Sequence, residues 1–372
     1  MAIHLDSLQI DAFRGIKHLA VPKLNQINLV AGDNNCGKTS ILEAILLLRN
    51  PMEFSNILRI SRLRNQGVRW NGESVYQSFL ALFPHMEPET MDLMEVSVSA
   101  QQGQRRIEYN LLGTQNTVML DDLAVRQRIT APHRESLGEL PQECLEFQGV
   151  LRYDLGDGKK NKNAVEFNEF DRIGTFGISR RSFLNIVYLS PFDHLGGNLF
   201  GQIINTERYK RLCVSMLQLF DPCIDDLLLL KETHSGRPVE CVHHCQLGSM
   251  PISTYGDGIK KVLSIANGLA KAQNGILLID EIETAIHAKY YKDIFSFIQL
   301  ASQKFNVQVF ITTHSLEAID QFLELQEYDR QGDAEDISVI TVKKTPDGSY
   351  SRVLTGRQVY ENREQFGFEV RL

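Results

Sequence analysis

The sequence predicts an α/β protein with a mixed β core, an inserted antiparallel and helical lobe, and no long coiled coil. Continuous apolar runs at residues 276–279 and 307–311 are typical of buried parallel strands, and segments with helical periodicity flank them. A glycine-rich segment at residues 32–39 joins a strand-like run to an apolar helix, as in the phosphate-binding units of α/β folds. No heptad pattern is long enough to predict a coiled-coil arm.

Periodicity assigns the elements in chain order. The N-terminal segment is expected to contain strands at 3–10, 19–21 and 25–30 and a buried helix at 40–49. In the less periodic middle region, an antiparallel lobe is expected from short strands at 96–99, 106–111 and 150–153 and an exposed turn at 156–163. The remainder is expected to contain a strand at 186–189, a helix at 202–220, a hairpin of 227–231 with 239–244, helices at 259–272, 290–304 and 317–325 around the two apolar strands, and a final hairpin of 338–342 with 350–354.

Length and charge limit the possible functions. The 372 residues, 43% hydrophobic and 23% charged, are enough for one domain with a core of residues 1–50 and 186–372 and an inserted variable lobe of residues 51–185. With 39 basic and 46 acidic residues the net charge is −7, which argues against indiscriminate DNA binding. Local basic clusters around Arg64 and Lys160 leave a DNA-binding patch open, although solvated loops also account for them.

Targeting signals are not evident in the sequence. No apolar run is long enough to cross a bilayer, and the N-terminal stretch has early acidic residues and no apolar core of the secretory type. The six cysteines have no framework spacing, as is usual in a reducing compartment. We therefore expect a cytoplasmic protein without membrane contact.

The segment GDNNCGKT at residues 32–39 matches the phosphate-loop pattern in full. Its glycines allow backbone N–H groups to turn toward phosphate oxygens, and the following helix directs its positive end at them. Lys38 is expected to reach the β- and γ-phosphates, and the Thr39 hydroxyl to bind Mg²⁺. The residues expected to contact the nucleotide here are Gly32, Asn34, Asn35, Gly37, Lys38, Thr39 and Ser40.

Two further strand ends supply catalytic candidates. The apolar run at 276–279 ends at Asp280, which is expected to hold the Mg²⁺ shell, and at Glu281, which is placed to orient or deprotonate the attacking water. The doublet favours ATP hydrolysis over a small-molecule kinase function. His314 follows the next strand, where an imidazole can contact the γ-phosphate. The expected cofactors are therefore ATP and Mg²⁺.

A second glycine-containing segment precedes the helix at 259–272. Ser253, Gly256, Asp257 and Gly258 place small residues at a helix N-terminus, which is a phosphate-binding surface. Because the chain already has a phosphate loop, this surface is expected to cover the ATP of another copy. The prediction is a head-to-tail homodimer, or a higher homo-oligomer, with ATP between subunits.

Together these segments carry a family resemblance. The run STYGDGIKKVLSIANGLAKAQNGILLIDEIETAIH, with QVFITTHS after it and AFRG and GDNNCGKTS before it, resembles the RecF/SMC-related ABC ATPases. Within them it most resembles the ATPase domains of overcoming-lysogenization-defect (OLD) nucleases and their stand-alone relatives in bacterial anti-phage systems. The resemblance covers about residues 3–49 and 187–325 and implies an ABC-type P-loop ATPase.

The resemblance also implies roles for individual residues. The loop at 256–258 would be the signature motif acting in trans, and Arg14 would be an auxiliary phosphate contact. Asp193 lies where relatives have the glutamine of the Q-loop, and His287 lies on the loop that meets the partner subunit. OLD proteins continue into a Toprim nuclease domain, whereas the residues after 325 suggest a hairpin and a short tail without clustered acids. We therefore expect no nuclease activity from this chain alone.

Two cysteine-containing segments have alternative interpretations. The run CVHHC at residues 241–245 is spaced too tightly for the usual paired zinc ligands, and alternate residues of a strand point to opposite faces, so zinc is not expected. Cys36, inside the phosphate loop, is either an oxidation-sensitive thiol or a small filler.

The motifs are compatible with three functions for an ATPase of this type. The leading one is a sensor or scaffold ATPase whose ATP-dependent oligomer holds or releases a separate effector, expected to be a nuclease, in phage defence. The alternative is a RecF-like DNA-binding ATPase in DNA repair, which would need a positive groove. A transporter ATPase is disfavoured by the missing Q-loop glutamine and by the form of the signature loop. The acidic net charge favours the first over the second.

Overall fold

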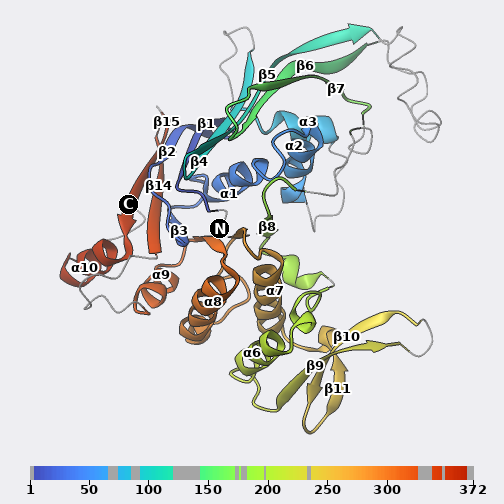
Figure 1. Cartoon of the computed structure of the whole chain (residues 1–372), viewed down its shortest axis with the longest axis vertical. Coiled ribbons are helices and arrows are strands. Elements are labelled where there is room, and N and C mark those ends of the chain that lie inside the picture. Colours follow the sequence, from blue (N-terminus) through green and yellow to red (C-terminus); the bar gives the residue numbers. More distant parts are fainter. Residues whose placement is uncertain are drawn as a thin grey trace.

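The computed structural model describes residues 4–65, 74–84, 93–119, 143–171, 176, 182–196, 198–232, 236–325, 337–345 and 348–366. A central sheet lies between an antiparallel sheet with its own helices and a second layer of helices (Figure 1). This arrangement confirms the predicted α/β class with a mixed β core. None of the described helices is long and apolar enough to span a membrane.

The central sheet contains β3 (Ile27–Ala31), β8 (Ile186–Leu189), β12 (Ile276–Ile279), β13 (Gln308–Thr313), β14 (Ile337–Thr345) and β15 (Gly348–Thr355). Their order is β15-β14-β3-β13-β12-β8, and every neighbouring pair is parallel except the terminal hairpin of β14 and β15. Parallel strands are normally covered on both faces, and β3, β12 and β13 are buried along their whole lengths. The strands predicted from apolar runs are confirmed.

Side chains of the central sheet alternate between two hydrophobic clusters. In β12, Ile276 and Leu278 pack into one cluster, while Leu277 and Ile279 pack into the other. This alternation follows from the pleat, which directs successive side chains to opposite faces. The sheet is therefore shared by two cores and fixes the position of both layers.

An antiparallel sheet covers one face. It contains β1 (Ser7–Phe13), β2 (Ile16–Val21), β4 (Met94–Gln102), β5 (Arg105–Met119), β6 (Glu143–Leu155) and β7 (Asn161–Asn168). Their order is β2-β1-β4-β5-β6-β7, so strands from the expected lobe extend a sheet that begins with the N-terminal hairpin. The lobe and the N-terminal strands accordingly share one hydrophobic cluster.

Two of these strands are longer than the sequence predicted. The expected strands at 106–111 and 150–153 extend to the bounds of β5 and β6, and pairing continues where Thr114 lies opposite Gln148 and Asn116 opposite Glu146. Hydrophobic periodicity reports burial, and the outer part of β5 is polar and largely accessible. Backbone pairing continues there without a hydrophobic pattern to reveal it.

Helices complete the two outer layers. Those beside the antiparallel sheet are α1 (Lys38–Leu47), α2 (Phe54–Ser61) and α3 (Val75–Leu80). Those on the opposite face are α6 (Glu207–Leu217), α7 (Asp257–Lys271), α8 (Tyr291–Phe305) and α9 (Leu316–Leu323). Among the described helices, α7 and α8 are the longest at 15 residues each, so none forms a long coiled coil.

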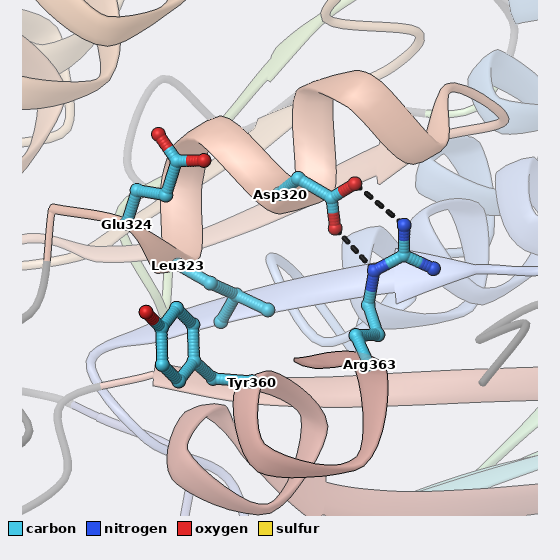
Figure 2. Close-up of a pocket in the computed structure, with 5 residues that line it drawn as sticks. All are labelled: Asp320, Leu323, Glu324, Tyr360 and Arg363. Carbon is cyan, nitrogen blue, oxygen red and sulfur yellow. Dashed lines mark hydrogen bonds and ion pairs between the residues drawn. The ribbon is translucent and has the colours of Figure 1, made fainter. Parts of the chain in front are cut away.

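The segment after β15 forms a helix, α10 (Gly356–Phe366), where the sequence suggested only a short tail. Arg363 of α10 forms a bidentate ion pair with Asp320 of α9, and Tyr360 and Leu323 line the same pocket (Figure 2). The helix is mostly polar and has few apolar residues to produce a periodic signal. The helix is held by Val359, which is fully buried in the core of the helical layer, and by this ion pair, and a single buried residue leaves no periodic pattern in the sequence.

A small three-stranded sheet projects from the helical layer (Figure 1). Its strands are β9 (Ile224–Lys231), β10 (Pro238–His244) and β11 (Gly248–Pro251), in the order β11-β10-β9. The predicted hairpin of the first two strands is confirmed, and β11 adds a third strand that the sequence analysis did not assign.

A buried carboxylate on α1 organises the region beside the phosphate loop. Glu43 is fully buried and pairs with Arg14 from the turn after β1 and with Arg64, each at 2.7 Å. The Arg14 side chain is itself only 10% exposed. The Arg64 guanidinium also donates to Ser40 Oγ at 3.0 Å. The network therefore joins the antiparallel sheet to the helix that follows the phosphate loop.

Replacing Glu43 by alanine is expected to lower the free energy of unfolding by about 3 kcal/mol, because the buried Arg14 guanidinium would lose its counter-charge. Denaturant titration followed by circular dichroism measures this change. Glu166→Ala, at an exposed position of β7, is the matched control, with an expected change below about 0.5 kcal/mol. A Glu43→Ala effect as small as the control would contradict a structural role for the ion pair.

Candidate nucleotide-binding and hydrolysis site

Three neighbouring strands of the central sheet end at one edge. β3, β13 and β12 are adjacent and parallel, so their carboxyl ends meet there. The phosphate loop follows β3, Asp280 and Glu281 follow β12, and His314 follows β13. Ligands of open α/β sheets bind at this edge. The structure thus brings together the three motifs that the sequence predicted for one site.

The phosphate loop has a conformation that depends on its glycines. A Cβ on Gly32 would lie 2.5 Å from the Val342 carbonyl oxygen and 2.7 Å from Cys36 Sγ, so no side chain fits. Gly37, at φ 106°, caps the N-terminus of α1, and Asn35 also has a positive φ of 64°. The loop therefore curves around the helix N-terminus, where exposed N–H groups and the helix dipole favour anions.

The Lys38 ammonium group is held by the backbone of the loop. Lys38 Nζ donates to the carbonyl oxygens of Gly32 and Asp33, both at 2.8 Å, so the ammonium group lies over the loop. Burial raises the pKa of the Cys36 thiol, which favours its interpretation as a small filler over a reactive thiolate. The curved phosphate loop, the Lys38 ammonium group and the N-terminus of α1 together fit a nucleotide polyphosphate.

Asp280 is the most connected residue of the site. Its side chain is buried and accepts hydrogen bonds from Thr312 Oγ1 at 2.6 Å, from Thr39 Oγ1 at 3.0 Å and from Tyr188 OH at 3.2 Å. Burial, and then the Asp280 charge, raise the pKa of the Tyr188 hydroxyl, which therefore stays a donor. The adjacent Thr39 hydroxyl and carboxylate are hard oxygen donors, as a Mg²⁺ site requires.

Glu281 adopts an unusual backbone conformation. Its φ is 47°, in the left-handed region that a residue with a side chain seldom occupies. Its backbone N–H donates to Thr312 Oγ1 at 2.8 Å, so one threonine holds both acidic residues. The Glu281 side chain is partly accessible at the sheet edge. Strained positions of this kind recur at functional sites, and a water activator needs such access.

His314 is oriented by a carboxylate that the sequence analysis did not select. Its Nδ1 lies 2.6 Å from Glu283 Oε1, and its backbone N–H donates to the same oxygen at 2.8 Å. The imidazole is 52% exposed, whereas Glu283 is 10% exposed. With Nδ1 directed at Glu283, Nε2 is the ring nitrogen that can face a phosphate.

The second predicted anion surface lies at the N-terminus of α7. Gly256 is the N-cap, and no atom lies within 4 Å of the position of a Cβ there. Asp257 begins the helix, and Ser253 lies in the preceding 3-10 turn. Gly258 packs close to the loop after Glu281, where the Ala285 carbonyl oxygen is 3.3 Å from a built Cβ. The open N-cap therefore borders the same sheet edge as the catalytic candidates.

The other predicted contacts have partners within the chain. Arg14 is paired with Glu43, as described above, so a phosphate contact by Arg14 stays a prediction. The Asp193 carboxylate accepts from the Ser190 N–H at 2.7 Å and closes its own turn. His287 is exposed and accepts from the Lys289 N–H at the start of a 3-10 turn.

Asp221, Cys223 and His244 form the one group of possible metal-binding side chains found in the described part of the chain. His244 Nδ1 accepts from the N–H groups of Gln246 and Leu247, both at 3.2 Å, and Nε2 lies 3.3 Å from Asp221. A metal-bound histidine normally donates through its second nitrogen. These contacts satisfy His244 as a structural residue and do not fit a zinc site.

Comparisons with known proteins agree with this geometry. A family model described as "AAA ATPase domain" matches residues 3–109, and one described as "AAA domain, putative AbiEii toxin, Type IV TA system" matches residues 172–320. An "ATP/GTP phosphatase" of Helicobacter pylori is 22% identical over 351 residues, covering 88% of this chain and 90% of that protein. The predicted ATPase activity is confirmed at this level.

Two more similarities are shorter or more distant. The "DNA replication and repair protein RecF" of Nitrosococcus oceani is 37% identical over 62 residues, which is 17% of each protein. A solved structure titled "Crystal structure of the SmcHead bound to the C-winged helix domain of ScpA" aligns with a TM-score of 0.48 and 14% identity, covering 96% of this chain and 99% of that one.

Thr312→Val is expected to lower kcat for ATP hydrolysis by about tenfold, because both Asp280 and Glu281 lose the hydroxyl that positions them. Thr312→Ser keeps the hydroxyl and is the matched control, expected to keep most of the activity. Steady-state phosphate release measures both variants, with thermal melting to confirm folding. A folded Thr312→Val protein with the wild-type kcat would contradict this role.

Proposed function

We propose that this chain, which belongs to the RecF/SMC-like ABC ATPases, uses ATP to control its own dimerisation, and that the ATP-bound dimer engages a separate effector in anti-phage defence. In this proposal ATP binding assembles the dimer and hydrolysis releases it. The acids at the sheet edge then set the lifetime of the assembly.

Each side chain of the site has a proposed task. Thr39 and Asp280 would hold Mg²⁺, which supplies charge neutralisation to the phosphates when bound. Lys38 neutralises charge on the transferred phosphoryl group, and Glu281 orients the attacking water and accepts its proton. Glu283 orients His314 toward the γ-phosphate. These tasks match the geometry of a hydrolytic site, in which positioning and charge stabilisation account for most of the rate.

The open N-terminus of α7 is the observation that carries the proposal. A phosphate loop already occupies the N-terminus of α1, yet α7 presents a second glycine-capped helix end without neighbouring atoms at Gly256. Such an end favours an anion. The γ-phosphate of an ATP on a second copy satisfies it. Two such contacts, related by a two-fold axis, produce a closed dimer with two composite sites.

The defence role is supported by resemblance. The C-terminal half matches a family model whose description includes a toxin of a toxin–antitoxin system, and the motifs resemble those of OLD-family ATPases. In this proposal ATP binding and hydrolysis change only the assembly state of the ATPase, so a partner protein must act against the phage. We propose a nuclease as that partner.

A second candidate function is DNA binding for repair. A surface hollow of about 500 Å³ on the antiparallel sheet is lined by four basic residues, Arg106, Arg152, Lys160 and Lys162. Basic grooves of this kind bind the phosphate backbone. The similarity to a protein named for DNA replication and repair supports the same function. Acidic residues Asp11 and Glu108 line the hollow as well, and the net charge is −7, which weakens the case.

Mixing two inactive variants is expected to restore ATPase activity if the site is composite. A Cβ at Gly256 meets no atom of its own chain, so Gly256→Arg is designed to block the partner's nucleotide, whereas Lys38→Ala disables its own phosphate loop. In an equimolar mixture, heterodimers contain one intact site, so roughly a quarter of wild-type activity should return. Phosphate release from each variant and from the mixture measures this.

A mixture of Lys38→Ala with Glu281→Gln is the matched control. Both changes affect the same half of the composite site, so no heterodimer contains an intact one, and activity should stay absent. Full activity of Gly256→Arg alone, or no recovery in the first mixture, would contradict the composite site.

Cells that carry the natural locus are expected to yield fewer phage plaques than cells whose locus encodes Glu281→Gln. The reason is that an assembly that cannot hydrolyse ATP is unable to cycle. Plaque counts measure this, and survival after ultraviolet irradiation tests the repair alternative in the same strains. Unchanged plaque counts together with raised ultraviolet sensitivity would replace the defence proposal by DNA repair.

A further inference from the structure

Lys261 is a buried lysine that neither the hydrolysis scheme nor the sequence motifs use. It lies on α7 and is 2% exposed, and its ammonium nitrogen has no hydrogen-bond partner in the structure. An unpartnered ammonium group is costly to bury. Burial lowers the pKa of Lys261 to about 8. A hydrophobic residue at this position would avoid the cost, so the lysine is a candidate for a functional role.

The acidic residues near Lys261 come from the hydrolysis site and from the turn at 193–195. Asp193 in the 3-10 turn at 193–195 and Asp280 after β12 act on it most strongly, followed by Glu283 and Glu281. Burial, and then the Lys261 charge, lower the pKa of His194, a buried residue of the same turn. In the fold, α7 packs against both the turn at 193–195 and β12, so the buried ammonium group lies near carboxylates from two separate elements without a direct hydrogen bond to them.

Lys261 also has a fixed relation to the partner-facing end of α7. It follows Asp257, the first residue of the helix, by one turn, a rise of about 6 Å. On the same turn, Lys260 pairs with Asp257 at 3.2 Å, so the two lysines differ in environment. A helix transmits displacement along its axis, so a force on the N-terminus of α7 moves the Lys261 ammonium group among the carboxylates.

We propose that Lys261 is a positioning residue that couples the partner-facing N-terminus of α7 to the carboxylates of its own hydrolysis site. The inference rests on the proposed dimer. Carboxylates crowded at one edge repel one another, and the ammonium group offsets that repulsion and holds the turn of Asp193 close to the loop of Asp280 and Glu281. Contact of α7 with the partner's nucleotide then adjusts the position of these acids, so that hydrolysis at the two sites is linked.

Lys261→Met tests this because methionine fills a similar volume without charge. We expect kcat for ATP hydrolysis to fall by about tenfold or more, while KM for ATP changes by less than about threefold. The melting temperature should change little, because the loss of charge balance at the carboxylates and the removal of an unpartnered buried ammonium group act in opposite directions. Lys271→Met, at an exposed position near the end of the same helix, is the matched control and should match wild type in all three measurements.

A double-mutant cycle with Asp193→Asn tests the electrostatic link. If Lys261 acts through Asp193, the double variant should be no slower than Lys261→Met alone, because the charge that needed balancing is also gone. Additive losses in kcat would overturn the inference. So would a wild-type kcat for Lys261→Met, or a loss accompanied by a lower melting temperature and a raised KM.

The failure of this inference is distinguishable from failure of the proposed function. If Gly256→Arg and Lys38→Ala complement each other but Lys261→Met hydrolyses ATP normally, the composite site is supported and the coupling role is contradicted. If the mixture shows no recovery of ATPase activity, the composite site is contradicted, and the coupling role, which rests on it, is contradicted as well.

Discussion

The hydrogen bonds to the Asp280 carboxylate join the parts of the central sheet on which the candidate site depends. Thr312 comes from β13, Tyr188 from β8 and Thr39 from the helix after the phosphate loop, and all three hydroxyl groups meet a side chain that is 4% exposed. A buried carboxylate without these donors would be strongly destabilising. The hydrogen bonds that satisfy the buried Asp280 carboxylate therefore also place the oxygens that a Mg²⁺ ion would need.

The two outer layers bring different components to that edge. The layer with the antiparallel sheet provides α1 and holds it through the ion pairs of Glu43, while the opposite layer provides α7. Each helix presents a glycine-capped N-terminus, but only α1 follows a phosphate loop. This asymmetry is the basis of the proposed dimer, in which the unused helix end of one chain would complement the nucleotide held by another. Lys261 lies on α7 near Asp280 and Glu281, and in the proposed dimer it couples the partner-facing end of α7 to these carboxylates.

Elements with buried faces could be predicted from the sequence, because burial leaves a periodic pattern of apolar residues. The strand at 276–279 has the predicted bounds because all four of its residues are buried and apolar. The predicted ATPase activity is confirmed by the family models, which describe AAA ATPase domains, while the roles of single site residues stay predictions. Thr312, Glu283 and Tyr188 were missed because their functions arise from contacts between distant segments. The same is true of α10, a mostly polar helix that is held by the buried Val359 and by the ion pair of Arg363 with Asp320.

The claim that ATP joins two copies through the N-terminus of α7 is tested most directly by sedimentation velocity. The Glu281→Gln protein would be compared with the Glu281→Gln, Gly256→Arg double variant, each with Mg²⁺ and ATP and each checked for bound nucleotide. We expect a dimer for the single variant and a monomer for the double variant, with ATP bound to both. A monomer in both cases, or an equal dimer in both cases, would contradict the composite site.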